Sequence, residues 1–185
     1  AAYALAAHAA GADDLAGACV ALCAASAGFL CFNFPPAKVF MGDAGSVPLG
    51  FLAGGLGWLG LARGLWPAWF PLLVFAPFIV DATVTLARRV LAREPFLRAH
   101  RTHYYQRLVL GGWSHGRLAL LEWALMCATA CSALLALAQH AAVQRAILAG
   151  WIVAFGVLLV AIDRHHPRKP SPPGPTPGQT PGTRR

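Results

Sequence analysis

Residues 33–46 read NFPPAKVFMGDAGS, and this short polar stretch separates two long apolar runs, 15–34 and 47–62. Each run is close to the ~20 residues that a helix needs to cross a bilayer. Polar groups beside hydrocarbon are costly, so a segment with Lys38 and Asp43 at a membrane rim favours ligand binding over packing. The alternative is an ordinary turn, in which prolines end one helix and glycine lets the next begin.

The composition of the whole chain indicates a membrane protein. Its 185 residues are 57% hydrophobic and 12% charged, which is too apolar for an ordinary soluble domain. We predict an all-α polytopic transmembrane helix bundle with about five full membrane spans, plus the end of an earlier one in the alanine-rich opening. The predicted spans are 15–34, 47–62, 66–87, 118–138 and 146–162, and Asp81 and several prolines interrupt the third.

The composition changes abruptly after residue 162. Proline, glycine and basic residues dominate the last part, which has no apolar side chains to build a core. We therefore predict two parts: a transmembrane part at 1–162 and a disordered, basic, proline-rich cytoplasmic tail at 163–185.

Basic residues orient the predicted spans. They cluster at Lys38, in the loop 88–117 and in the tail, whereas only Arg63 and Arg145 fall in the alternating loops. By the positive-inside rule, the loop with Asp43, the loop 88–117 and the C-terminus face the cytoplasm. The net charge of +8 then reflects topology and attraction to membrane lipids, and it does not indicate binding to nucleic acid.

Asp43 is the first candidate for chemistry. Gly42 and Gly45 flank it and allow close approach by a ligand, and Ser46 is placed to cap the following helix. A helix N-terminus attracts anions, so a phosphate can lie beside Asp43 with a divalent metal between them. One carboxylate rarely holds Mg²⁺ alone, and a diphosphate substrate would supply the missing ligands.

A second candidate cluster lies in the loop after the third span. His100 and His103 share one face if this segment is helical. With Arg101 and Arg107 beside them, they fit phosphate binding or proton transfer, and Tyr104 and Gln106 fit contact with a sugar or base. A histidine pair without a third ligand is weak evidence for zinc. The alternative is a solvated basic loop held by lipid headgroups.

Two acidic residues fall inside predicted spans. Asp81 is a candidate functional residue because an intramembrane acid is costly, but pairing with Arg88, Arg89 or another segment is the equal alternative. Glu122 lies near the same interface, and snorkelling toward it is the favoured interpretation.

Three segments together resemble the polyprenyl-phosphate N-acetylhexosamine-1-phosphate transferases, the membrane enzymes of glycosyltransferase family 4. They are 33–46, 77–86 and 100–107, and they occur in the family's order. The resemblance covers residues 1–162 and excludes the tail. It implies transfer of a sugar 1-phosphate from a UDP-N-acetylhexosamine to undecaprenyl phosphate, with release of UMP, dependence on Mg²⁺ or Mn²⁺, and a bacterial inner-membrane location; a homo-oligomer is compatible with it.

The resemblance also implies roles for residues of the first segment. Asp43 corresponds to the family's catalytic metal ligand, and Phe40 corresponds to the phenylalanine that lies against the uracil ring. Asn33 and Lys38 match further positions of the substrate site.

The histidine segment matches the part of the family that lines the nucleotide-sugar site. His100 and His103 take catalytic positions there, and Arg101 and Arg107 would help to hold the diphosphate. The form HRTHYYQR resembles members that serve O-antigen, capsule or other surface polysaccharides. The muramoyl-pentapeptide transferase of peptidoglycan synthesis, which has a more histidine-dense run, is the nearest alternative.

Two elements of the family pattern are not found in this sequence, namely an acidic pair in an earlier cytoplasmic loop and an Asn/Asp-rich loop. Asp13 and Asp14 do not supply the pair, because the basic-residue distribution places them opposite Asp43. We expect the chain to be the C-terminal half of a longer enzyme and inactive alone. The competing class is a non-enzymatic membrane component, such as a transporter half or a degenerate fragment.

Overall fold

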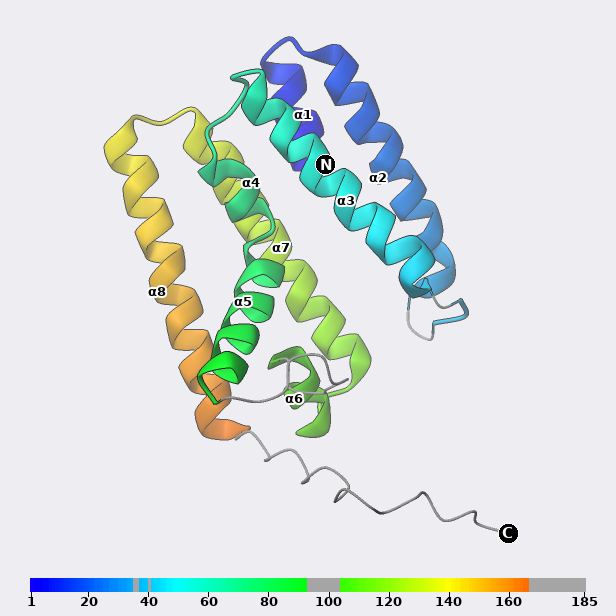
Figure 1. The fold of residues 1–185 in the computed structure, drawn as a ribbon, viewed down its shortest axis with the longest axis vertical. Coiled ribbons are helices and arrows are strands. Elements are labelled where there is room, and N and C mark those ends of the chain that lie inside the picture. Colours follow the sequence, from blue (N-terminus) through cyan, green and yellow to red (C-terminus); the bar gives the residue numbers. More distant parts are fainter. Residues whose placement is uncertain (35–36, 40, 93–103, 167–185) are drawn as a thin grey trace.

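The computed structural model describes residues 1–34, 37–39, 41–92 and 104–166, without the side chains of residues 105 and 106. All regular secondary structure in these ranges is helical, which confirms the predicted all-α bundle (Figure 1). The helices are α1 (Ala2–Ala9), α2 (Asp13–Asn33), α3 (Gly42–Ala62), α4 (Trp69–Val74), α5 (Ala76–Leu91), α6 (Tyr104–Leu110), α7 (His115–Leu137) and α8 (Ala141–His165).

Four of the described helices, α2, α3, α7 and α8, are long and apolar enough to cross a membrane. They correspond to four of the predicted spans. Only 11–17% of the residues in their apolar windows are buried inside the bundle. The remaining apolar surface therefore needs a non-aqueous environment, as expected for a multi-pass membrane protein.

The predicted span at 66–87 is interrupted. It forms two helices, α4 and α5, that meet at Phe75, whose φ of −103° and ψ of 14° break the helical path. Pro77 lies in the first turn of α5 and has no N–H to donate to a carbonyl of the preceding turn. The expected interruption of this span by proline is therefore present, as a break between two helices.

The last helix extends beyond the predicted span. It ends at His165, so Asp163 belongs to the final turn of α8 and not to a separate tail. Residues 167–185 lie outside the described part of the chain. The helical part thus reaches three residues into the segment that composition assigned to the tail.

The connections between helices gather at two ends of the bundle (Figure 1). The lower end, as drawn, contains the α2–α3 connection, the C-terminus of α5, α6, the N-terminus of α7 and the C-terminus of α8. The upper end contains the α1–α2, α3–α4 and α7–α8 connections. Asp43 therefore lies at the lower end, and Asp13 and Asp14 lie at the upper end.

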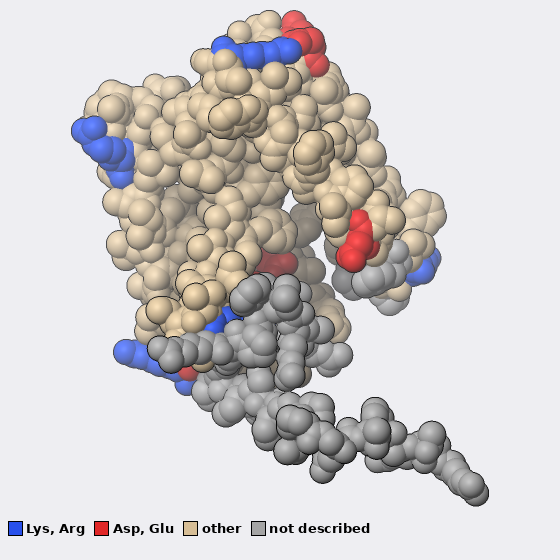
Figure 2. Space-filling model, viewed as in Figure 1, with Lys and Arg blue, Asp and Glu red and all other residues tan. Residues whose placement is uncertain are grey.

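Charge is distributed unequally between these ends. Among the described residues, only Arg63 and Arg145 are basic at the upper end, whereas six basic residues lie at the lower end: Lys38, Arg88, Arg89, Arg107, Arg117 and Arg164. On the face drawn in Figure 2, the band between the ends is uncharged except for acidic atoms in a hollow beside α3. Basic side chains of the described residues are therefore concentrated at the lower end.

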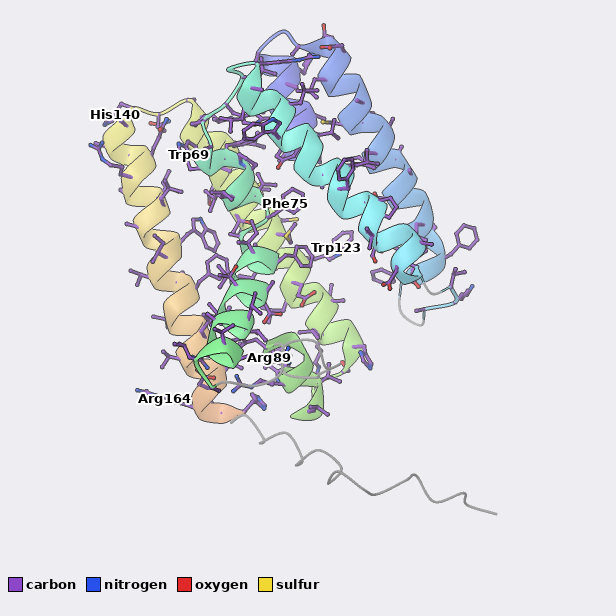
Figure 3. The ribbon with its side chains drawn as sticks, in the orientation of Figure 1. Trp69, Phe75, Arg89, Trp123, His140 and Arg164 are labelled. Atoms are coloured by element: carbon purple, nitrogen blue, oxygen red, sulfur yellow. The ribbon has the colours of Figure 1, made fainter. Side chains whose placement is uncertain are left out.

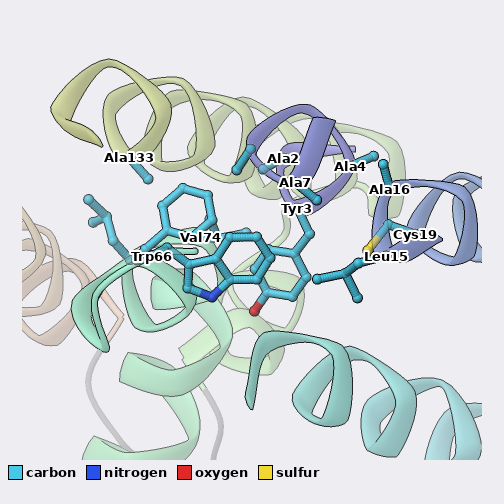
Figure 4. Close-up of a cluster of buried hydrophobic side chains, with 13 residues drawn as sticks. Ala2, Tyr3, Ala4, Ala7, Leu15, Ala16, Cys19, Trp66, Val74 and Ala133 are labelled. Atoms are coloured by element: carbon cyan, nitrogen blue, oxygen red, sulfur yellow. The ribbon is translucent and has the colours of Figure 1, made fainter. Parts of the chain in front are cut away.

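An aromatic cluster packs the upper half of the bundle (Figure 4). The rings of Tyr3 and Trp66 stack with their centroids 5.3 Å apart, and Phe70 lies 5.3 Å from Trp66 and is fully buried. The indole N–H of Trp66 donates a hydrogen bond of 3.1 Å to the carbonyl of Gly57. Trp66 lies directly against α3 because Gly60 has no side chain there, and the absence of a side chain at Gly57 makes room for the Tyr3 hydroxyl.

Gly60→Ala is expected to destabilise this cluster. A Cβ at position 60 would lie 1.9 Å from Cζ2 of Trp66, whose side chain is only 3% exposed and has little room to move. Overpacking of this kind costs about 1–3 kcal/mol, so we expect a lower thermal unfolding midpoint in detergent micelles. Gly54→Ala is the matched control, because its Cβ would meet nothing within 4 Å. Equal midpoints for the two variants would contradict this packing.

Candidate functional site

The N-terminus of α3 is shaped by two glycines. Gly42 adopts a φ of 59°, in the left-handed region that favours glycine. A Cβ on Gly45 would lie 2.5 Å from Cγ of Met41, so Gly45 lets the Met41 side chain fold over the first turn. The helix consequently begins at Gly42 and not at Val47.

The predicted cap at Ser46 is wrong. Met41 is the N-cap residue and makes no side-chain capping bond, while Ser46 lies exposed within the helix. Further along, Pro48 has no N–H to donate to the carbonyl of Ala44, which therefore lacks its usual helical partner. The first turn of α3 thus has backbone N–H groups that no preceding turn pairs, and its Ala44 carbonyl lacks the donor that a residue other than proline would supply.

Asp43 occupies the first turn of α3 and is exposed. The partial positive charge at a helix N-terminus stabilises a carboxylate in this position. The same unpaired N–H groups can bind an anionic ligand beside the carboxylate. The geometry therefore suits a site that holds a cation and a phosphate together.

Asn33, at the end of α2, is the second oxygen donor of this connection. Its Oδ1 is buried and has no hydrogen-bond partner among the described residues. A buried acceptor without a partner costs about 1–3 kcal/mol, so this atom favours a ligand or water that satisfies it. Lys38 is exposed nearby in the chain, and its backbone N–H donates to the carbonyl of Phe32 at 3.1 Å. Phe40 lies outside the described residues.

The donor set of the α2–α3 connection fits Mg²⁺ or Mn²⁺. The Asp43 carboxylate and the Asn33 amide oxygen are hard ligands of the kind these ions prefer. No group of three or more His, Cys, Asp or Glu within the described ranges is placed to hold a metal ion. An ion here would take its other ligands from phosphate oxygens and water, which is the usual coordination of Mg²⁺ in nucleotide sites.

A second polar cluster lies at the lower end, where α5, α6 and α8 meet. Asp163 accepts hydrogen bonds from Arg88 at 2.7 Å and from Arg107 at 2.8 Å. The Tyr104 hydroxyl donates to the same carboxylate at 3.4 Å. The two guanidinium groups lie 5.3 and 4.8 Å from the centroid of the Tyr104 ring. Burial raises the pKa of the Tyr104 phenol, so the hydroxyl remains a donor at neutral pH.

Arg107 is part of this internal cluster. It is 6% exposed, and its guanidinium bonds Asp163 and the backbone carbonyl of His166, the latter at 3.0 Å from Nε. These contacts tie α6 to the end of α8, and they occupy the side chain that the sequence suggested for diphosphate binding. No local spacing reveals the tie, because Asp163 lies 56 residues away.

Asp81 reaches the start of α6. Its Oδ1 accepts the backbone N–H of Tyr104 at 2.8 Å and the hydroxyl of Thr85 at 3.3 Å. Asp81 and Glu122 also line a mostly apolar cavity of about 450 Å³ between α5, α6, α7 and α8. The sequence suggested either a functional role for Asp81 or pairing with Arg88, Arg89 or another segment. The structure shows a contact with another segment, the backbone of α6.

The other residues of the histidine segment lie outside this description. His100, Arg101 and His103 are not among the described residues, and neither is the side chain of Gln106. Helix α6, which begins at the residue that follows His103, lies at the lower end. In Figure 3, Arg89 and Arg164 mark this end, and His140 marks the opposite one.

Comparison with known proteins finds one family model and several named relatives that are similar to this chain. Residues 1–60 match glycosyl transferase family 4. The chain is 38% identical over 100 residues to a probable undecaprenyl-phosphate N-acetylglucosaminyl 1-phosphate transferase of Bacillus subtilis, covering 53% of this chain and 28% of that protein. No solved structure matches the chain.

The chain is also similar to proteins that carry a different name from the Bacillus subtilis relative. Phospho-N-acetylmuramoyl-pentapeptide-transferases of Moorella thermoacetica and Geobacillus kaustophilus are 34% and 35% identical, over 67% and 66% of this chain and 38% and 37% of their own. The chain thus spans roughly a third of the length of the curated relatives it matches. The segment 33–46 lies within the part that matches the family.

Proposed function

Because the chain belongs to glycosyl transferase family 4, we propose that the full-length protein transfers N-acetylhexosamine 1-phosphate from a UDP-sugar to undecaprenyl phosphate. The observation that carries the proposal is the first turn of α3, where exposed Asp43 stands in a turn shaped by Gly42 and Gly45. The unsatisfied oxygen of Asn33 on the same connection supports it. The name of the Bacillus subtilis relative specifies the same acceptor lipid.

The proposed reaction is a displacement at phosphorus. A phosphate oxygen of the acceptor lipid attacks the β-phosphorus of the UDP-sugar, the bond between this phosphorus and the oxygen of UMP breaks, and UMP leaves. The product is a lipid-linked diphosphate sugar. Charge increases on the departing UMP, so groups that oppose negative charge lower the barrier.

Residues of the lower end would share this work. Asp43, with the Asn33 oxygen, would hold Mg²⁺, and a bound Mg²⁺ would neutralise charge on the diphosphate. The N–H groups of the α3 first turn and the exposed Lys38 would bind phosphate oxygens. Phe40 would contact the uracil.

The histidine segment would complete the nucleotide-sugar site. We assign His100 and His103 to this site, with Arg101 and Gln106 beside them. The concentration of basic residues at the lower end supports a cytoplasmic site in a bacterial inner membrane, where nucleotide sugars are available. The lipid product would begin a surface polysaccharide such as O-antigen or capsule.

A second candidate is the transfer of phospho-N-acetylmuramoyl-pentapeptide to the same class of lipid. It is favoured by the relatives of Moorella thermoacetica and Geobacillus kaustophilus, which carry that name. The two candidates share the chemistry at phosphorus and differ in the sugar, so the donor distinguishes them.

Membranes that contain the full-length protein should transfer label from a radiolabelled UDP-N-acetylhexosamine to undecaprenyl phosphate and release an equal amount of UMP. The assay compares several UDP-N-acetylhexosamines with UDP-N-acetylmuramoyl-pentapeptide. Chelation with EDTA should stop transfer and added Mg²⁺ should restore it, because the proposed site has too few protein ligands to retain its ion. Transfer from the pentapeptide donor alone would establish the second candidate, and no transfer from any donor would contradict both.

A further inference from the structure

Helix α6 is too short to hold its own position. It has seven residues, and helices of this length are marginal unless tertiary contacts support them. Its buried hydrophobic side chains, Tyr104 and Leu108, pack against Leu118 of α7 and Ile162 of α8. The same two side chains border the 450 Å³ cavity, so the packing beneath α6 is incomplete.

Two carboxylates from other helices hold α6 in place. Asp81 of α5 accepts the backbone N–H of Tyr104 at 2.8 Å, at the first residue of α6. Asp163 of α8 accepts from Arg107 at 2.8 Å and from the Tyr104 hydroxyl at 3.4 Å. The contacts thus bind the backbone at the start of α6 and a side chain one turn later.

The end of α8 reinforces this attachment. Arg107 donates from Nε to the carbonyl of His166 at 3.0 Å. Gly111, just after α6, lies so close to the His166 ring that a Cβ there would be 2.1 Å from Nδ1. His166, the residue after α8, therefore contacts both the middle of α6 and the residue that follows it.

We propose that Asp81 and Asp163 are positioning residues, which hold α6 so that the adjoining histidine segment enters the nucleotide-sugar site in a productive position. The proposal rests on the proposed function, because that function assigns His103 to this site. Tyr104 directly follows His103, and adjacent Cα atoms are about 3.8 Å apart, so a shift of Tyr104 is transmitted to His103. A misplacement of about 1 Å can cost roughly a hundredfold in rate.

The first experiment measures the attachment without any activity assay. Leu108 is 6% exposed beneath α6, whereas Leu110 is 68% exposed. In a variant in which the five native cysteines are replaced, Leu108→Cys should react slowly with a charged maleimide, and Leu110→Cys should react rapidly. Adding Asp81→Ala or Asp163→Ala should raise the rate of maleimide reaction at position 108 about tenfold or more. A tenfold rise corresponds to a loss of ~1.4 kcal/mol in the free energy of the opening that exposes this position.

Asp14→Ala is the matched control for these variants. Asp14 also forms an aspartate–arginine pair, 2.6 Å from Arg63, but it lies at the upper end. The control should leave the reactivity at position 108 unchanged. If Asp81→Ala and Asp163→Ala also leave it unchanged, the attachment does not depend on these carboxylates and the proposal is overturned.

The second experiment measures transfer by the full-length protein. At equal amounts of folded protein, Asp163→Ala should lower kcat/KM for the UDP-sugar about 10- to 100-fold relative to Asp14→Ala. Asp163→Glu, which keeps the charge, should recover part of this loss. If position 108 becomes reactive but kcat/KM stays at the control value, α6 is attached as described and has no positioning role.

The two proposals fail in distinguishable ways. If the unaltered protein transfers no sugar phosphate, the proposed function and the positioning role both fall, while the maleimide rates still report the attachment. If the unaltered protein is active, only the variants decide the positioning role. Asp163→Ala leaves Arg107 buried with an unpaired charge, which can prevent the variant from accumulating. In that case Asp81→Ala tests the same attachment, because Asp81 holds α6 through a backbone N–H.

Discussion

Asp43→Asn is expected to reduce Mg²⁺-dependent release of UMP by about a thousandfold. Metal stabilisation of transition-state charge contributes several kcal/mol, and ~4 kcal/mol corresponds to about three factors of ten in rate. Asparagine keeps the size of the side chain and removes its charge, so the ion loses its one charged ligand on this connection. The measurement is the steady-state release of UMP from a UDP-sugar by full-length protein in membranes.

Asp13→Asn is the matched control for this prediction. Asp13 is also an exposed acid in the first turn of a long helix, but it lies at the upper end of the bundle. Its replacement should leave turnover within about twofold, as for a surface change remote from the site. Because Asp43 is exposed, both variants should accumulate in membranes like the unaltered protein. Unchanged turnover in Asp43→Asn would remove Asp43 from the metal site.

His103→Ala is expected to lower transfer about a hundredfold. General acid–base catalysis contributes at least about a hundredfold, and a hydrogen bond from a charged group to a phosphate is worth ~1.5–3 kcal/mol, which is a similar factor. The amount of folded protein in membranes should change little. Transfer from a radiolabelled UDP-sugar, divided by the amount of protein, measures the effect.

His140→Ala provides the comparison for His103→Ala. His140 is exposed at the upper end, before α8, and its side chain makes no capping bond. Its replacement should affect neither transfer nor accumulation. If His103→Ala lowers the amount of folded protein as strongly as it lowers transfer, the histidine has a structural role.

Much of the fold could be predicted from hydropathy, because a span requires about 20 residues with little charge. This requirement located α2, α3, α7 and α8. It did not locate the break at Phe75, since hydropathy is the same for one apolar helix and for two. The start of α3 was also missed, because Gly42, Asp43 and Gly45 have the composition of a loop, and only the left-handed φ of Gly42 shows where the turn ends.

The candidate site was accessible to sequence reasoning only where its residues are neighbours in the chain. Asn33, Lys38 and Asp43 fall within one short segment, so their spacing suggested a common ligand. The tie between Arg107 and Asp163 joins residues 56 positions apart, and no local pattern encodes it. The contact of Asp81 with the backbone N–H of Tyr104 cannot be predicted from the identity of residue 104, because every residue except proline carries that group.

The joint between α4 and α5 separates two regions that differ in how tightly they are packed. An interrupted helix persists at membrane depth only where protein covers its exposed carbonyls, and here Phe70 and Leu73 bury the upper side of the joint in the aromatic cluster. Below the joint, α5 borders the cavity. The joint therefore divides one apolar segment into an upper part, α4, that is packed tightly in the bundle and a lower part, α5, that lies beside unfilled space.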